Sequence, residues 1–381
     1  MDRLFYSELA RKSLEGQELD NGTCARILSD ASLEILPLLD AAFQVRKHYF
    51  GLEVRVHILN NAQNGNCPED CHYCAQAKSS KADIEEYGMK SDEEMLQEAR
   101  QAYSKGASCY CMVFAGRGAS KARIDRLKRV LAQIKSEFPD KEICVSTGFV
   151  SNEGAVELKQ AGLDRLNHNL NTSEAHYPSI CTTHTFADRL NTLLAARSAG
   201  LKVCSGMIVG MGEEHADIIE VARRLRALKA ESIPVNLLVP IEGNVLTGPP
   251  TNNGECRSIR PKTFGGDSLG LNPGGDSLGL TPDFILRILC LFRFLNPSAE
   301  IRVAAGREMH LRSMEVMALY PANSLFLQGY LNAKGSSNAH TLRMIKDAGF
   351  NIKSEADLDW LIGIDNAKAE LKSIKELRPA I

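Results

Sequence analysis

Three cysteines, Cys67, Cys71 and Cys74, stand close together in a C-x3-C-x2-C pattern. Three thiolates at this spacing hold three irons of a 4Fe-4S cube, because such clusters are bound by cysteines from short loops. No fourth cysteine stands nearby in the sequence, which leaves one iron open. An open iron binds the amino and carboxylate groups of S-adenosylmethionine (SAM) and passes an electron to its sulfonium, which breaks to give an adenosyl radical. The pattern therefore predicts radical chemistry.

A structural zinc loop is the main alternative for these cysteines. Zinc sites usually pair one C-x2-4-C with a second such pair, and no matching pair lies downstream. The spacing therefore favours an iron-sulfur cluster over zinc.

Length and composition favour a cytoplasmic enzyme. The 381 residues are 44% hydrophobic and 24% charged, and the net charge of -2 gives no reason to expect nucleic acid as a partner. No apolar stretch approaches the roughly 20 residues that span a bilayer, and the N-terminus does not look like a signal peptide. Eleven cysteines in a chain that is not exported indicate metal or redox chemistry rather than disulfides.

Short β-branched runs alternate with amphipathic segments, which indicates βα units around a parallel sheet. Eight strands are expected, at 54–59, 108–114, 142–146, 163–169, 201–209, 233–239, 301–304 and 324–328. Helices are expected between them, at 91–104, 123–137, 186–198, 218–230 and 282–295. Eight alternations predict an α/β fold, a (β/α)8 TIM-type barrel with its chemistry at the C-terminal ends of the strands.

The domain organisation that follows has three parts. We expect an N-terminal helical extension at 1–50, the barrel at 51–335, and a C-terminal helix and tail at 336–381. A Gly-rich loop insertion interrupts the barrel at about 245–281, between the sixth and seventh strands. Within it, Gly-Gly-Asp-Ser-Leu-Gly-Leu at 265–271 recurs at 274–280, and its glycine content predicts a surface loop.

A second set of thiols falls on the expected strands. Because side chains alternate faces along a strand, Cys111, Cys144 and Cys204 converge on the barrel axis if their faces point inward. Arg302 meets them there, and a buried guanidinium needs an anionic partner such as a thiolate-ligated cluster. The alternative for any single buried cysteine is a small hydrophobic residue.

The motifs resemble those of the biotin synthase family of radical SAM enzymes. They occur in the family's order over roughly residues 40–350, and together they are far more specific than any one of them. The matching runs are Cys67–Gln76, Tyr110–Met112, Asn167–Leu170, Val203–Gly206, Gly210–Glu213 and Ala305–Glu308.

The resemblance implies two metal clusters. Cys67, Cys71 and Cys74 would hold the SAM-binding 4Fe-4S cluster. A 2Fe-2S cluster deeper in the barrel would be held by Cys111, Cys144, Cys204 and Arg302.

The resemblance also implies a SAM site and a substrate site. Tyr73, Ile208 and Val239 match residues around the adenine, and Arg189 matches the arginine that pairs with the SAM carboxylate. Without the family, the first three are typical of core packing and Arg189 of a solvated helix surface.

Asparagines supply the remaining contacts. Asn167, Asn169 and Asn236 match polar side chains around SAM and the substrate, whose ureido ring offers both donors and an acceptor. Without the family they are typical of strand-end caps. Asn171 departs from the pattern, because most members carry an aspartate there for the ribose hydroxyls of SAM. Val113 and Phe114 are also bulkier than the residues often found in the family.

The resemblance implies sulfur insertion into dethiobiotin to give biotin. The expected partners are dethiobiotin, an electron donor such as flavodoxin or ferredoxin, and a second copy of the chain in a homodimer. His57, His168 and His310 are expected to be structural, since removal of a hydrogen atom needs no general base. Two alternatives stay open: another radical SAM enzyme on the same barrel, such as a maturase or mutase, and a non-catalytic iron-sulfur or zinc protein.

Overall fold

The eight predicted strands form a closed parallel barrel in a computed structural model, which describes residues 3–246, 279–356, 358 and 362. Each strand pairs with the next around the barrel, and β1 pairs with β9 to close it. The barrel strands are β1 (Glu53–Gln63), β2 (Cys109–Phe114), β3 (Glu142–Ser146), β4 (Arg165–Asn167), β5 (Lys202–Cys204) with β6 (Met207–Val209), β7 (Ser232–Leu237), β8 (Glu300–Val303) and β9 (Ser324–Leu327). The predicted fold class is therefore confirmed.

The fifth predicted strand is divided into β5 and β6, although its register against β7 continues across the break. Cys204 pairs with Ser232, and Met207 pairs with Val235. At Gly206 between them, an added Cβ would lie 1.8 Å from the carbonyl oxygen of Pro234. The two backbones approach so closely here that only glycine fits.

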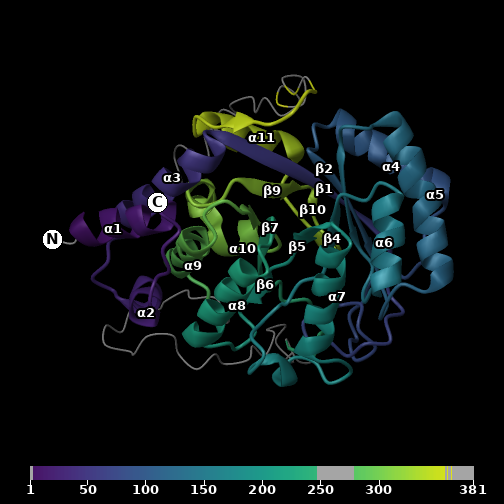
Figure 1. The fold of residues 1–381 in the computed structure, drawn as a ribbon, viewed down its shortest axis with the longest axis horizontal. Coiled ribbons are helices and arrows are strands. Elements are labelled where there is room, and N and C mark those ends of the chain that lie inside the picture. The colour runs from purple at the N-terminus through teal and green to yellow at the C-terminus, as the bar shows by residue number, and fades with distance from the viewer. Residues whose placement is uncertain (1–2, 247–278, 357, 359–361, 363–381) are drawn as a thin grey trace, which may run out of the picture.

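Helices surround the barrel, with α1–α3 on one side and α4–α6 on the opposite side (Figure 1). The outer helices are α4 (Asp92–Ser104), α5 (Lys121–Glu137), α6 (Asn152–Gln160), α7 (Phe186–Ser198), α8 (His215–Ala227), α9 (Pro282–Leu295) and α10 (Arg307–Leu311), with 3-10 turns η1 (Tyr177–Ser179) and η2 (Arg312–Leu319). The N-terminal helices are α1 (Arg3–Leu14), α2 (Asn21–Ser29) and α3 (Ile35–Phe50).

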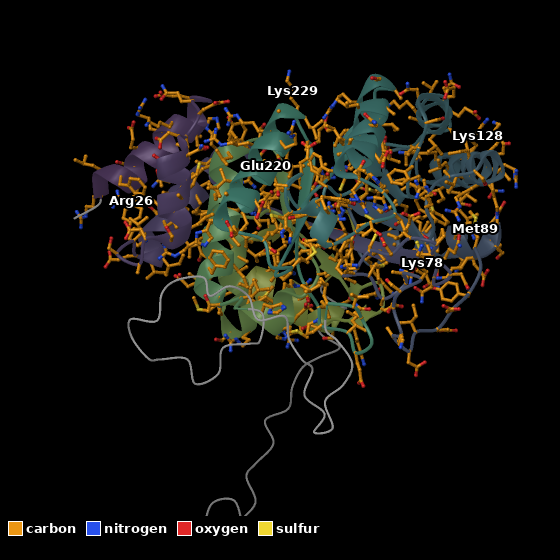
Figure 2. All side chains as sticks on the ribbon, turned by 90° about the horizontal axis from the view of Figure 1, so that it is seen from below. Arg26, Lys78, Met89, Lys128, Glu220 and Lys229 are labelled. Atoms are coloured by element: carbon orange, nitrogen blue, oxygen red, sulfur yellow. The ribbon has the colours of Figure 1, made fainter. Side chains whose placement is uncertain are left out.

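The N-terminal helices cover α9, which accounts for the composition of that helix. Every residue from Phe284 to Leu295 is buried, although most barrel helices keep one polar face. Helices α1, α2 and α3 all pack on α9, so its outer face is covered as well as its inner face. In the view from below, side chains fill the space between the elements and the exposed Lys229 projects from the outside (Figure 2).

The chain after β9 adds one expected helix and three short strands that the sequence did not indicate. These are β10 (Gly329–Tyr330), β11 (Ala333–Lys334), α11 (Asn338–Asp347) and β12 (Asn351–Ile352). Strands β10 and β11 form a hairpin that places Tyr330 at the barrel mouth, and β12 pairs with the start of β1. A helix near 339–350 was expected, whereas the hairpin was not.

Other expectations fall partly outside the described residues. The repeated heptapeptide lies there except for Gly279 and Leu280, and the boundaries of the three expected domains stay a prediction. None of the described helices combines the length and the apolar character that crossing a membrane requires.

Candidate active site

The loop that follows β1 places its three cysteines at the C-terminal mouth of the barrel. Short turns shape this loop: the Cys74 amide donates to the Cys71 carbonyl at 3.0 Å, and the Lys78 amide donates to the Glu69 carbonyl at 2.9 Å. Cys67, Cys71 and Cys74 all line one cavity of about 260 Å³. The predicted outer thiol set is therefore brought together at the end of the barrel where such folds carry their chemistry.

The spacing of these thiols fits a cluster better than a single ion. Two groups of three metal-ligating side chains in the described part of the chain have donor atoms within 4.8 Å of one another, and neither unites these three cysteines. A lone zinc ion would need its ligands about 2.0–2.3 Å from one centre. Cys67, Cys71 and Cys74 line a common cavity but are spaced too widely to bind one ion together. This spacing suits a group of several metal atoms, so the residues fit a 4Fe-4S cluster.

Arg189, on the first turns of α7, is a buried cation at the wall of this cavity. The Nη1 group donates to the Asn169 carbonyl at 3.0 Å, and Nη2 donates to the Tyr73 hydroxyl at 3.1 Å. Burial alone disfavours its charge, but Tyr73, Tyr177 and the nearby Cys71 raise the pKa of Arg189 above its usual value. No carboxylate pairs with Arg189 among the described residues, so it is available to an anionic ligand.

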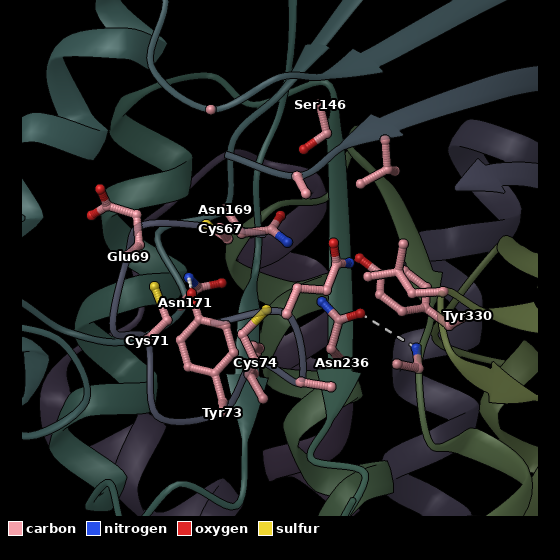
Figure 3. A pocket seen from close by; sticks show the side chains of 18 of the residues that line it. Cys67, Glu69, Cys71, Tyr73, Cys74, Ser146, Asn169, Asn171, Asn236 and Tyr330 are labelled. Carbon is pink, nitrogen blue, oxygen red and sulfur yellow. Dashed lines mark hydrogen bonds between the residues drawn. The ribbon is translucent and has the colours of Figure 1, made fainter. Parts of the chain in front are cut away.

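The predicted asparagines gather between the cysteine loop and Tyr330 (Figure 3). Asn171 donates from Nδ2 to the Tyr73 hydroxyl at 2.5 Å, and Asn169 accepts at Oδ1 from the Gly206 amide at 3.1 Å. Asn236 accepts from the Ala305 amide at 3.3 Å. These bonds fix the amides while their side chains still line the cavity.

Apolar side chains complete the wall. Ile208 on β6 and Val239 after β7 both line the cavity, as the resemblance implied. Val113 and Phe114, the bulkier residues at the end of β2, line it too. His168 is buried beside the Phe149 ring at 5.3 Å, and burial, with the Arg189 charge, lowers its pKa well below the usual value. The imidazole is therefore neutral.

The inner thiols meet deeper in the barrel, as the alternation along the strands predicted. Cys111, Cys144 and Cys204 are almost fully buried and line a second cavity together with Arg302. Cys111 pairs with Cys144 across β2 and β3, and Arg302 Nη1 lies 3.9 Å from the Cys204 sulfur. The hydrogen bond from Cys144, with the Arg302 charge, lowers the pKa of Cys204.

The residues of this inner set fit an anionic cluster. Arg302 Nε is buried and has no hydrogen-bond partner in the described part of the chain. Its Nη2 group contacts Glu300 at 2.5 Å, the Ser232 hydroxyl at 3.0 Å and His57 Nε2 at 3.1 Å. Three convergent thiols and a guanidinium with an unused donor are the chemistry that a bound iron-sulfur group needs.

The two cavities adjoin each other. Val113, Ser146, Asn167 and Tyr330 line both of them. Asn167 also donates from Nδ2 to the Cys204 sulfur at 3.3 Å. A ligand held among the asparagines therefore lies between the outer thiols at the mouth and the inner thiols below.

A cysteine that is distant in the sequence approaches the outer set in space, which the spacing did not indicate. Cys181 lies 3.8 Å from Cys71, sulfur to sulfur, although 110 positions separate them in the chain. Beside it stand Glu69 and His184, which also line the cavity and were not predicted. The Cys109 thiol, 4.0 Å from Cys111, is a further addition to the inner set. Sequence spacing gives no signal for the Cys71–Cys181 contact, whereas Cys109 lies two residues from Cys111 on the same face of β2.

Two of the histidines that were expected to be structural, His310 and His57, have different surroundings. His310 Nε2 binds the Leu238 carbonyl at 2.8 Å, which is a structural contact. His57 instead lies inside the inner site, between Glu300 at 2.8 Å and the Cys111 sulfur at 4.0 Å.

Two family models match this chain. The Radical SAM superfamily model matches residues 64–225, and the Biotin and Thiamin Synthesis associated domain matches residues 234–351. A closed parallel barrel with a three-cysteine loop at its mouth defines the chain as a radical SAM enzyme.

Curated relatives narrow the class. The biotin synthase of Magnetococcus marinus is 52% identical over 345 residues, which cover 91% of this chain and 98% of that protein. The biotin synthase of Bacillus subtilis is 39% identical over 353 residues, with 93% and 97% covered. The chain belongs to the biotin synthase family.

Solved structures of other proteins share the fold at much lower identity. Methylornithine synthase superimposes with a TM-score of 0.70 at 19% identity and covers 93% of this chain and 99% of its own. The hydrogenase maturase HydG of Carboxydothermus hydrogenoformans gives a TM-score of 0.71 at 17% identity, with 92% and 79% covered. These likenesses show the barrel fold alone.

Proposed function

We propose that the chain inserts sulfur into dethiobiotin to form biotin, with two clusters on one barrel axis. The observation that carries this proposal is the pair of adjoining cavities, one bounded by the outer thiols and the other by the inner thiols. A substrate carbon in the first cavity is then exposed to a radical from above and to a sulfur source from below.

The outer cavity is assigned to SAM. When bound by Cys67, Cys71 and Cys74, the 4Fe-4S cluster supplies the electron that splits SAM into methionine and an adenosyl radical. Arg189 offers the one buried guanidinium of the described cavity wall without a carboxylate partner, which suits the SAM carboxylate. Tyr73, Ile208 and Val239 offer the flat and apolar surfaces that an adenine needs.

The substrate is assigned to the space beneath. The amides of Asn167, Asn169 and Asn236 offer donors and acceptors to the ureido ring of dethiobiotin. When held by Cys111, Cys144, Cys204 and Arg302, the 2Fe-2S cluster supplies the sulfur atom. The barrel wall excludes water and holds the carbon in place, which protects the radical from side reactions.

The remaining assignments rest on the resemblance. We propose an electron donor of the flavodoxin or ferredoxin class, a homodimer and a cytoplasmic enzyme. The cysteine usage supports the last of these, because free thiols and iron-sulfur clusters persist in a reducing compartment.

The division of labour between the two thiol sets provides the test. In anaerobically reconstituted protein, Cys71→Ala should abolish reductive SAM cleavage and keep the absorption spectrum of the inner cluster. Cys144→Ala should keep part of the SAM cleavage and form no biotin. Cys24→Ala, a buried cysteine on α2, is the matched control and should behave as the parent does. Biotin formation at the parental level by the Cys144 variant would refute the sulfur-donor assignment.

A further inference from the structure

We propose that Glu69 and His184 form a positioning relay that holds Arg189 in place for the carboxylate of SAM. This inference rests on the proposed function, since it assumes that Arg189 binds that carboxylate. The relay joins the cysteine loop, which contributes Glu69, to the first turn of α7, which carries Arg189.

The hydrogen-bond roles within the relay follow from the chemistry of its members. Arg189 has only donors, so its Nη2 contact with His184 Nε2 at 3.1 Å makes that nitrogen an acceptor. The Tyr177 hydroxyl, which accepts from Arg189 Nε, donates to the same nitrogen at 2.8 Å. A neutral imidazole that accepts at Nε2 carries its proton on Nδ1. His184 Nδ1 lies 2.5 Å from Glu69 Oε2, so it donates to the carboxylate.

Glu69 is itself held from other directions. The Thr183 hydroxyl donates to Oε2 at 2.7 Å, and Arg117 Nη1 donates to Oε1 at 2.9 Å. The Glu69 side chain is buried, so these donors and His184 are what keeps its charge compensated. A carboxylate fixed in this way selects one tautomer of His184, in the manner of the carboxylates that orient histidines beside metal sites.

The backbone fixes the spacing between His184 and Arg189. Thr185 caps α7, because its hydroxyl accepts from the Asp188 amide, and Asp188 completes the capping box by accepting from the Thr185 amide. His184 immediately precedes this cap, and Arg189 lies one turn into the helix. The imidazole therefore reaches the guanidinium without any mobile segment between them.

The hydrogen bonds of the Arg189 guanidinium hold it in one orientation. Nε is taken by the Tyr177 hydroxyl, one Nη1 bond goes to the Asn169 carbonyl, and Nη2 is divided between Tyr73 and His184. One Nη1 hydrogen remains for a ligand. Since Glu69 lies between two of the cluster cysteines, the same relay keeps the SAM carboxylate site in register with the cluster loop.

Two amide substitutions separate the two halves of the relay. In His184→Asn the amide reaches the position of Nδ1, so it keeps the bond to Glu69 and loses the acceptor for Arg189. In His184→Gln the amide reaches the position of Nε2, so its oxygen can accept from Arg189. His176→Asn is the control, because His176 is a half-buried histidine near η1 that contacts Ser179 and the Met211 carbonyl instead of the relay.

The measurement is SAM affinity of the reconstituted enzyme by equilibrium titration, repeated with decarboxylated SAM, which lacks the carboxylate. We expect His184→Asn to weaken SAM binding about tenfold, the effect of one hydrogen bond to a charged group. We expect His184→Gln to stay within about threefold of the parent. All variants should bind decarboxylated SAM equally, because the relay acts only through the carboxylate.

Two results overturn the relay. One is parental SAM affinity in His184→Asn, and the other is an equal loss for SAM and decarboxylated SAM, which would indicate general damage to the site. Failure of the proposed function is distinguishable, because it would appear as a parent enzyme that does not cleave SAM at all.

Discussion

Asn171 stands where the resemblance implies an aspartate, and its surroundings can accept a carboxylate at this position. Its backbone φ is +70°, a left-handed conformation that asparagine and aspartate both tolerate. Nδ2 donates to the Tyr73 hydroxyl at 2.5 Å, which leaves Oδ1 to accept from a ribose hydroxyl of SAM. In Asn171→Asp, the Tyr73 hydroxyl would turn and donate to the carboxylate, while it still accepts from Arg189.

The expected size of the effect follows from the change in charge. A hydrogen bond to a charged group contributes about 1.5–3 kcal/mol, against about 1 kcal/mol for a neutral one. The gain from Asn171→Asp is therefore on the order of 1 kcal/mol, or about fivefold in SAM affinity. The side chain is 3% exposed, so the carboxylate must be compensated, and Arg189 reaches the same Tyr73 hydroxyl from the other side.

The assay is a titration of SAM into parent and variant that both carry intact 4Fe-4S clusters. An analogue that lacks both ribose hydroxyls is the control, because its affinity should not change. Unchanged SAM affinity, or an equal gain for the analogue, would show that Asn171 does not contact the ribose.

Two predictions concern the barrel beneath the site. Burial opposes the charge of Glu142, but Arg165 and Arg55 lower the pKa of its carboxyl to about 2 from 4.5. The ionised Glu142 therefore stabilises the fold above about pH 4.5, and this stabilisation is lost as the pH falls towards about 2. Glu142→Gln in cluster-free protein should lower the free energy of unfolding in urea by about 3 kcal/mol at pH 7, and a deficit that does not shrink in acid would contradict a charge effect. Gly206→Ala should destabilise by on the order of 3 kcal/mol in the same assay, because its Cβ meets the Pro234 carbonyl. Gly88→Ala, with open space around its Cβ, should be nearly neutral, and equal losses for the two alanines would refute the steric account.

The strands and the inner thiols were predictable because each depends on a short period in the sequence. Alternation along β2, β3 and β5 is enough to place Cys111, Cys144 and Cys204 on inward faces once a barrel is assumed. The interruption at Gly206 was not predictable in this way, since it arises from contact with a neighbouring strand rather than from local preference.

Contacts between distant loops were beyond the sequence for a different reason. In the sequence, His184 is an ordinary polar residue before a helix. Its proposed role depends on Glu69, which is 115 positions away in the sequence, so no local pattern connects the two. The roles of Tyr73 and Arg189 came from the resemblance, because a tyrosine and a helix arginine are common elsewhere in proteins. What the structure adds is the absence of a carboxylate partner for Arg189 among the described residues.

The floor of the barrel offers an independent reason to place an anionic group among the inner thiols. Arg165 pairs with Glu142 at 2.6 Å and with Glu300 at 3.0 Å, Arg55 pairs with the same two carboxylates, and Arg302 pairs with Glu300. Three arginines against two glutamates leave one positive charge, even before the half-exposed lysine beside Glu142 is counted. Uncompensated charge is costly in the interior, so this surplus favours thiolates over thiols directly above it. An iron-sulfur cluster bound by thiolates is anionic and would compensate this positive charge. Three neutral thiols would leave the charge uncompensated.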